Sequence, residues 1–258
     1  MASASKYLSN IRDQPRLTGY YATMSLVVVI FAALWLFEGY YLITAWFPSL
    51  FDEITPINGV MAGAFMTLML ACSVVSLFRP TSAIGPSKVL VVGAGILGLT
   101  IPFAFLLDTP LLTLILLFVA VTILVLLITL HPGGADVLPA RRIGVDKLLV
   151  VLTIIIAIPF LWMAANFQWA QITLSDEIAE RWFYGGYSMY LLVIVSLMVV
   201  TSLDGATRRF TAWTSIFLTG ILGLISVVYP TELHSLGILG GGLLLAWCAI
   251  VGLATIRD

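Results

Sequence analysis

The chain has 258 residues, of which 61% are hydrophobic and only 10% are charged, and its mean hydropathy is +1.10. Soluble domains contain roughly 45–50% apolar residues, so this composition excludes an ordinary soluble domain and indicates an integral membrane protein. The formal net charge of -1 provides no basic face of the kind that nucleic-acid binding needs. We therefore expect the lipid bilayer to be the main partner and expect no nucleic acid.

Eight apolar runs are each long enough to cross a bilayer, which takes about 20 residues. They lie at residues 20–47, 57–78, 88–107, 110–130, 147–168, 184–203, 210–229 and 236–255. The third and fourth runs are separated only by Asp108, Thr109 and Pro110, and we divide them there because proline after an acidic residue is typical of a turn. The sequence thus predicts an all-α polytopic membrane protein with eight transmembrane helices.

The uneven distribution of charge predicts the orientation of these spans. If the N-terminus is inside, Arg181 is the only one of the twelve Lys and Arg residues on the outer side. Lys88 then counts as a cytoplasmic charge, and Asp204 belongs to a tight cytoplasmic turn. The acidic residues of the predicted outer loops are Asp52, Glu53, Asp108, Asp176, Glu177, Glu180 and Glu232. Because cytoplasmic loops carry the excess of Lys and Arg, we expect both termini in the cytoplasm and a multi-pass protein of the plasma membrane.

Sequence matches at nearly one spacing predict an internal repeat. The matches are Gly-Ile-Leu-Gly-Leu at 95–99 and 220–224, Asp-Glu-Ile at 52–54 and 176–178, and a tryptophan at 46 and 169, with shifts of 125, 124 and 123 residues. A four-helix unit ends on the side of the membrane where it began, so the two copies are expected to be parallel. The predicted organisation is a cytoplasmic N-terminal segment at 1–19, a first four-helix repeat at 20–130, a cytoplasmic linker at 131–145 and a second four-helix repeat at 146–258.

Glu38 places a carboxylate well inside the first predicted span. It precedes Phe47 by nine residues, which is about 14 Å of helix in a hydrocarbon core about 30 Å thick. A charge at that depth costs on the order of 2.5 to 3.5 kcal/mol, so an intramembrane acid is a functional-site candidate. Two interpretations stay open: a protonatable group at a ligand or proton site, or a neutral, hydrogen-bonded Glu that fixes helix packing.

The repeat extends this candidate site to other polar side chains. A shift of 124 places Asn166 opposite Leu42 and Gln168 opposite Thr44 in the counterpart of the first span. Along the helix axis, both positions lie within about one or two turns of Glu38. We therefore expect a site between the two halves, opened by the interruption of the fifth span at Pro159. Its predicted residues are Glu38, Tyr41, Asn166 and Gln168.

The remaining candidates are the two histidines and two glycine motifs, which give weaker functional signals. His131 and His234 fall on opposite faces of the predicted membrane, so they do not share a metal ion, and we expect neither a metal centre nor a cofactor. Glu232 and His234 form a candidate outer pH-sensitive pair, with an ordinary interfacial pair as the alternative. Two GxxxG motifs predict close helix packing, and their glycines are Gly59, Gly63, Gly237 and Gly241.

The segment from Gly220 to Thr255 consists of an apolar helix opened by Gly-Ile-Leu-Gly-Leu, a proline, and a second Leu- and Gly-rich helix. It resembles the repeated hairpin of the HdeD family of small membrane proteins, and the segment from Gly95 to Leu130 resembles it less well. That family is linked to acid resistance and has six spans, whereas eight are predicted here. The resemblance implies a stress-related membrane protein.

These observations predict a small permease or proton-coupled carrier in which Glu38 is the protonatable group. The alternative is a non-catalytic accessory or stress-related subunit of a membrane complex, or a homo-oligomer, in which Glu38 is structural and the glycine faces bind partner helices. A membrane-embedded enzyme ranks third, because no nucleophile, metal set or acid–base pair is recognisable in the sequence.

Overall fold

The computed structural model describes residues 15–39, 41–44, 46, 56–104, 110–138, 144–180 and 182–257. Several predicted loop charges lie outside these ranges, namely Asp52, Glu53, Asp108 and Arg181. The side chain of Glu38 also lies outside the described part of the structure. Throughout the described ranges the regular structure is helical, which confirms the all-α prediction.

The main helices are α2 (Pro15–Leu34), α4 (Pro56–Phe78), α5 (Ile84–Ala104), α6 (Pro110–Leu130), α7 (Lys147–Thr173), α9 (Phe183–Leu203), α10 (Arg208–Val228) and α11 (Gly237–Ile256). Shorter elements connect them: η1 (Trp35–Gly39), α3 (Tyr41–Thr44), η3 (Gly134–Val137) and α8 (Glu177–Glu180). Three of the main helices begin with proline, which fits the first helical position because its fixed backbone angle suits a helix and its missing N–H has no helical acceptor there. Each predicted span overlaps one main helix.

Six helices, α2, α4, α7, α9, α10 and α11, are long and apolar enough to cross a membrane among the residues that the structure describes. Shorter apolar stretches occupy 84–100 in α5 and 117–130 in α6. In a bilayer, a helix satisfies all of its backbone hydrogen bonds within the segment, which is why long apolar runs adopt this structure. The chain is therefore a multi-pass, all-helical membrane protein.

The first predicted span, 20–47, requires a correction, because it is not one continuous α-helix. The α-helical part ends at Leu34, a five-residue π-helical turn follows at Trp35–Gly39, and a short α-helix resumes at Tyr41–Thr44. Hydrophobicity alone does not reveal this interruption, because the residues on both sides of it are equally apolar. Glu38 lies in the π-helical turn, a feature that is rare and often found at functional sites.

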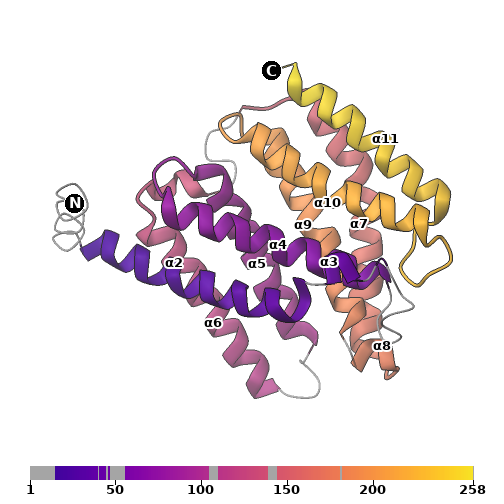
Figure 1. The fold of residues 1–258 in the computed structure, drawn as a ribbon, viewed down its shortest axis with the longest axis horizontal. Helices are drawn as coiled ribbons and strands as arrows, with labels where there is room; N and C mark the ends of the chain where they lie inside the picture. Colours follow the sequence, from indigo (N-terminus) through magenta and orange to yellow (C-terminus); the bar gives the residue numbers. More distant parts are fainter. Residues whose placement is uncertain are drawn as a thin grey trace.

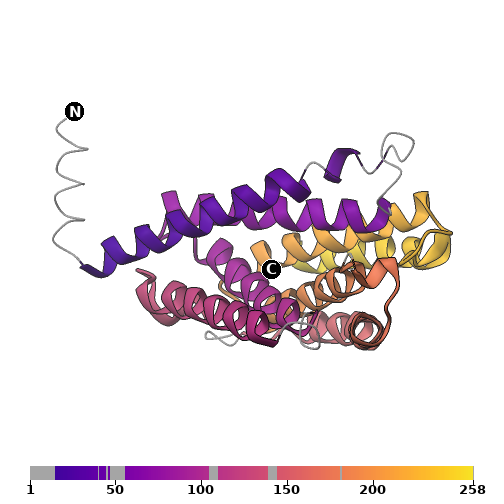
Figure 2. The ribbon, with the colours of Figure 1, turned by 90° about the horizontal axis from the view of Figure 1, so that it is seen from below.

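The helices pack in two similar sets. In the first set α2 packs on α4 and α6, and α4 packs on α5; in the second set α7 packs on α9 and α11, and α9 packs on α10. Between the sets, α5 packs on α9 and α10 packs on α4. Figure 1 shows α10 and α11 side by side, and Figure 2 shows α2 lying along α4. The four central helices are therefore α4, α5, α9 and α10, and among the described residues the first and fifth spans do not meet as predicted.

The bundle has two ends with different residues. We call the end formed by the start of α5, the end of α9 and the start of α10 the Lys88 end. The opposite end, formed by the starts of α4 and α9 and the loop between α10 and α11, is called the Tyr187 end. At the Tyr187 end the hydroxyl of Tyr229 donates to the carbonyl of Trp46 at 2.8 Å, so the two sets are also joined there.

Candidate functional site

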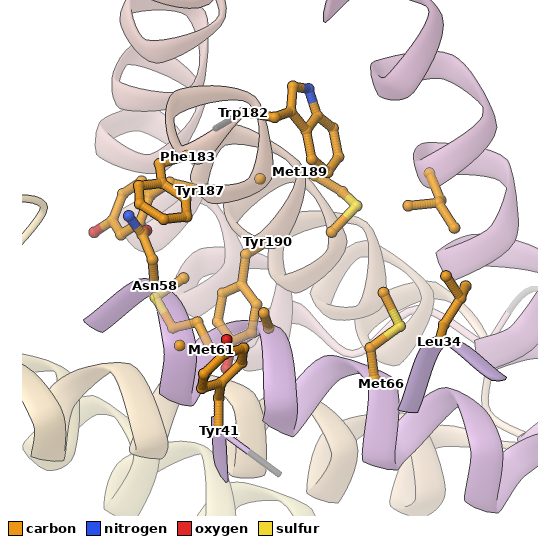
Figure 3. A pocket seen from close by; sticks show the side chains of 14 residues that line it. Leu34, Tyr41, Asn58, Met61, Met66, Trp182, Phe183, Tyr187, Met189 and Tyr190 are labelled. Atoms are coloured by element: carbon orange, nitrogen blue, oxygen red, sulfur yellow. The ribbon is translucent and has the colours of Figure 1, made fainter. Parts of the chain in front are cut away.

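A cavity of about 280 Å³ lies between α4 and α9 at the Tyr187 end. Figure 3 shows its lining, with the side chains of Asn58 and Tyr187 on one side and those of Leu34 and Met66 on the other. Leu34 directly precedes the π-helical turn and Tyr41 follows it. The cavity therefore borders the interruption of the first helix that carries Glu38.

Three polar groups that line this cavity have no hydrogen-bond partner among the described residues. They are Nδ2 of Asn58, Nε1 of Trp182 and the hydroxyl of Tyr187. Asn58 is 8% exposed and Tyr187 is 1% exposed, so solvent does not replace the missing partners. An unsatisfied buried group costs about 1–3 kcal/mol. Such groups beside an open volume indicate that water or a ligand completes their bonding.

A second cavity, of about 230 Å³, adjoins the first and is lined only by apolar residues of α2, α5 and α6. Leu34 and Leu97 contribute to both linings. A volume with polar groups thus lies next to an apolar volume, with Leu34 of α2 and Leu97 of α5 contributing to both.

At the Lys88 end, Lys88 and Asp204 form a buried ion pair between α5 and the end of α9. Their side chains are 2% and 0% exposed. Asp204 also accepts a hydrogen bond from the backbone N–H of Ala206 at 3.0 Å, which fixes the carboxylate in the turn before α10. Because a buried charge is costly unless it is paired, this contact strongly constrains how the two sets of helices meet.

A chain of hydrogen bonds lies next to the ion pair. The hydroxyls of Ser76 and Ser87 are 3.0 Å apart, and Ser87 is 3.0 Å from Nε2 of His131. Nδ1 of His131 accepts the N–H of Gly133 at 2.9 Å, so Nε2 carries the proton and donates to Ser87. Tyr20 donates to the carbonyl of Ser76 at 2.9 Å. Burial, together with the nearby charge of Arg16, lowers the pKa of His131 to about 4, so this histidine is neutral near pH 7.

His234 lies at the other end in an aromatic environment. Its ring stacks on Tyr187 with centroids 4.7 Å apart and meets Phe167 and Tyr184 edge-on. Both ring nitrogens are buried without a partner among the described residues. Burial lowers the pKa of His234 to about 4. The main-chain carbonyl of Glu232 accepts the N–H of Ser235, and the ring contacts of His234 among the described residues are with Phe167, Tyr184 and Tyr187.

The structure separates the other predicted site residues. Tyr41 lines the first cavity, but Asn166 is exposed and donates to the carbonyl of Trp162 in its own helix at 2.8 Å. Gln168 lines a different cavity, with residues of α5, α7 and α9. From the repeat alignment we expected these side chains to face one another. In the structure, equivalent helices of the two sets meet only at the centre of the bundle, and α2 and α7 lie outside this centre.

The glycine motifs lie at contacts within the chain. A Cβ added at Gly241 would lie 2.5 Å from the carbonyl oxygen of Gly223, and one at Gly63 would meet the backbone of Leu42. Gly59 is buried in α4, and Gly237 opens α11 with a φ of 69°. Gly63 and Gly241 therefore allow close approach of neighbouring segments of the same chain.

Sequence reasoning missed Lys88, Asp204, Ser87 and Tyr187. The sequence predicts that the third span starts at Lys88, whereas α5 begins at Ile84, so Lys88 lies one turn inside the helix. The available signal was a Lys just inside one apolar run and an Asp directly after another. Opposite charges at such positions favour a pair when both runs end on the same side of the membrane.

The fold and these sites define a polytopic, all-helical membrane protein with a central cavity. Comparisons of the chain with known protein families, with curated proteins and with solved structures found no match.

Proposed function

We propose that the protein is a small permease or proton-coupled carrier of the plasma membrane, with eight spans, both termini cytoplasmic, and Glu38 as its protonatable group. The observation that carries this proposal is the cavity between α4 and α9, which borders the interrupted first helix. Discontinuous helices beside a central cavity are a common way for carriers to build a substrate site.

The proposed duplication is supported by equivalent contacts in the two sets. The hydroxyls of Ser76 and Ser87 join α4 to α5 at 3.0 Å, and those of Thr201 and Thr211 join α9 to α10 at 2.9 Å. These positions are related by the same shifts, 125 and 124, that relate the sequence matches. Likewise, a Cβ at Gly98 would touch Ala120 and one at Gly223 would touch Leu245, both at a shift of 125.

Under this duplication α4 and α9 are counterparts, so the cavity lies at the interface of the two repeats. Carriers built from repeats place their substrate sites at such an interface, where one half moves against the other. The residues at the Lys88 end support the predicted topology. They bring the starts of α5, α7 and α10 together with the ends of α4, α6 and α9, as expected if consecutive spans cross the membrane in opposite directions.

The proposal is tested by asking from which side of the membrane the cavity is reached. Ala62 lines the cavity, and in a background with Cys72→Ala and Cys248→Ala the variant Ala62→Cys should react with an impermeant maleimide from both sides. The controls are Ser175→Cys and Ala206→Cys, both at exposed positions, which should react only from outside and only from inside, respectively. Labelling of Ala62→Cys from one side alone would favour the accessory-subunit alternative.

The role of Glu38 is tested in vesicles that contain only this protein and a trapped pH-sensitive dye. A potassium diffusion potential should drive proton entry in the parent protein, and Glu38→Gln, which mimics the protonated acid, should abolish it. Glu232→Gln is the matched control, because it removes an exposed acid from a loop. Equal proton entry with Glu38→Gln would remove Glu38 from the mechanism.

A further inference from the structure

The first cavity has the lining of a site for a flat ring. Five aromatic side chains form a large part of its lining, those of Tyr41, Trp182, Phe183, Tyr187 and Tyr190. Aromatic rings stack on other planar groups in offset or edge-on arrangements, which adds to the gain from burying apolar surface. The volume of about 280 Å³ lies just below the range of about 300–1,000 Å³ that is usual for small-molecule sites.

The unpaired polar groups of the first cavity indicate which hydrogen-bonding groups a bound ring must carry. Nδ2 of Asn58 and Nε1 of Trp182 only donate hydrogen bonds, and the hydroxyl of Tyr187 is also able to donate. A ligand that completes their bonding must therefore present acceptors. The described residues that line the cavity include no Lys, Arg, His, Asp or Glu. Since a charged ligand would be buried there without an opposite charge, an uncharged acceptor such as a carbonyl oxygen fits best.

The second cavity is suited to the apolar part of the ligand. It adjoins the first at Leu34 and Leu97, and its lining of aliphatic and Phe side chains offers no hydrogen-bonding side chain. A volume of about 230 Å³ with this lining suits an apolar tail and not a second polar group. Together the cavities match a molecule with a planar, acceptor-bearing head and one hydrocarbon tail.

We propose that the two cavities bind a tailed quinone, with its carbonyl-bearing ring between α4 and α9 and its tail between α2, α5 and α6. Given the carrier function proposed above, the quinone is the class of substrate that the carrier takes up from the bilayer. The inference concerns binding and needs no redox step.

The test uses tritiated decylubiquinone and the purified protein in detergent micelles, measured by scintillation proximity. Saturable binding is expected, and Asn58→Leu and Tyr187→Phe should each weaken it by about two- to tenfold, the range of one lost hydrogen bond. Tyr184→Phe is the matched control. Tyr184 is not among the residues that line the cavity, and its hydroxyl donates to Oδ2 of Asp176 at 3.1 Å, so the loss of this hydroxyl should leave the affinity unchanged.

The tail site is tested separately with Ala94→Leu, which fills part of the second cavity. This variant should weaken the binding of decylubiquinone and leave unchanged the binding of the tailless ring, 2,3-dimethoxy-5-methylbenzoquinone. Competition by methyl decanoate as strong as by decylubiquinone would overturn the ring assignment. Absence of saturable quinone binding from a protein that conducts protons would overturn this inference alone, whereas binding without two-sided access to Ala62→Cys would overturn the carrier function alone.

Discussion

The two ends of the bundle differ in how many of their buried polar groups have hydrogen-bond partners. At the Lys88 end an ion pair is closed, and Ser76, Ser87 and His131 are joined in one chain of hydrogen bonds. At the Tyr187 end Asn58, Trp182, Tyr187 and His234 keep buried polar atoms without partners among the described residues. Each end also has an exception. The hydroxyl of Thr207 lacks a partner at the Lys88 end, whereas at the Tyr187 end the buried amide of Gln171 donates to the carbonyl of Ala179 and accepts the N–H of Gly185.

This difference separates stability from binding. Satisfied buried networks rigidify a protein and specify one arrangement of its helices. Unsatisfied groups beside a cavity lower stability, and they persist when another molecule completes their bonding. The Lys88 end therefore holds the two sets of helices together, and the Tyr187 end retains the capacity to bind. Substitutions at the two ends should differ accordingly.

The largest expected effect comes from opening the ion pair. Asp204→Ala leaves the Lys88 ammonium buried without its carboxylate and should lower the free energy of unfolding by about 3–5 kcal/mol. Unfolding in detergent, followed by circular dichroism, measures this change. The double variant Lys88→Met/Asp204→Leu should recover most of the loss, and Arg209→Gln, at an exposed position, should stay within about 0.5 kcal/mol. An Asp204→Ala protein as stable as the parent would refute the assignment of the Lys88 end.

A smaller effect should appear as a function of pH. Burial lowers the pKa of His131 and of His234 from 6.5 to about 4. Between pH 6.5 and pH 4 the unfolded chain binds protons that the folded protein does not. The free energy of unfolding therefore has its full contribution from these histidines above about pH 6.5 and loses it as the pH falls toward 4. Protonation of His131 also displaces the N–H of Gly133, whereas the nitrogens of His234 have no partner to lose.

Because the two pKa shifts are the same, His131→Gln and His234→Gln should each reduce the pH dependence of unfolding by a similar amount, and the double variant should reduce it most. Denaturation curves at pH 7, 5.5 and 4.5 give the comparison, with the parent protein as reference so that the titration of carboxylates cancels. Parallel pH profiles for the parent and all variants would contradict the burial of both rings.

The smallest effect distinguishes one hydroxyl at each end. Ser87→Ala removes contacts to Ser76 and His131 and should cost about 1–3 kcal/mol. Tyr187→Phe removes a hydroxyl without a partner and should leave the ligand-free protein unchanged or slightly more stable. Melting temperatures in the same detergent test this order, and an equal loss for both variants would show that Tyr187 has a protein partner.

The helices were predictable from the sequence, because an apolar run long enough to cross a bilayer has few alternatives to a helix. The predicted spans 57–78 and 110–130 correspond closely to Pro56–Phe78 and Pro110–Leu130. Proline at the first position marks the start of both, which is a local signal that a single sequence carries.

The site was not predictable to the same degree, because its features depend on contacts between distant residues. Lys88 and Asp204 are separated by 116 positions, and neither residue alone shows that it is buried. The alignment of the repeat predicts that Asn166 and Leu42 lie at the same depth in the membrane. Two residues at the same depth are not in contact unless their helices also pack together. The cavity is formed instead by α4 and α9, whose apolar sequences give no sign that they enclose one.

The ion pair between Lys88 and Asp204 also has a consequence for biogenesis. Chains are synthesised at about 5–20 residues per second, so the ribosome needs on the order of 10 s to add the 116 positions that separate the two residues. During this interval the Lys88 ammonium lacks the Asp204 carboxylate. This contact between the two sets of helices therefore forms only after α9 has been made, which couples the final packing of the early helices to the synthesis of the late ones.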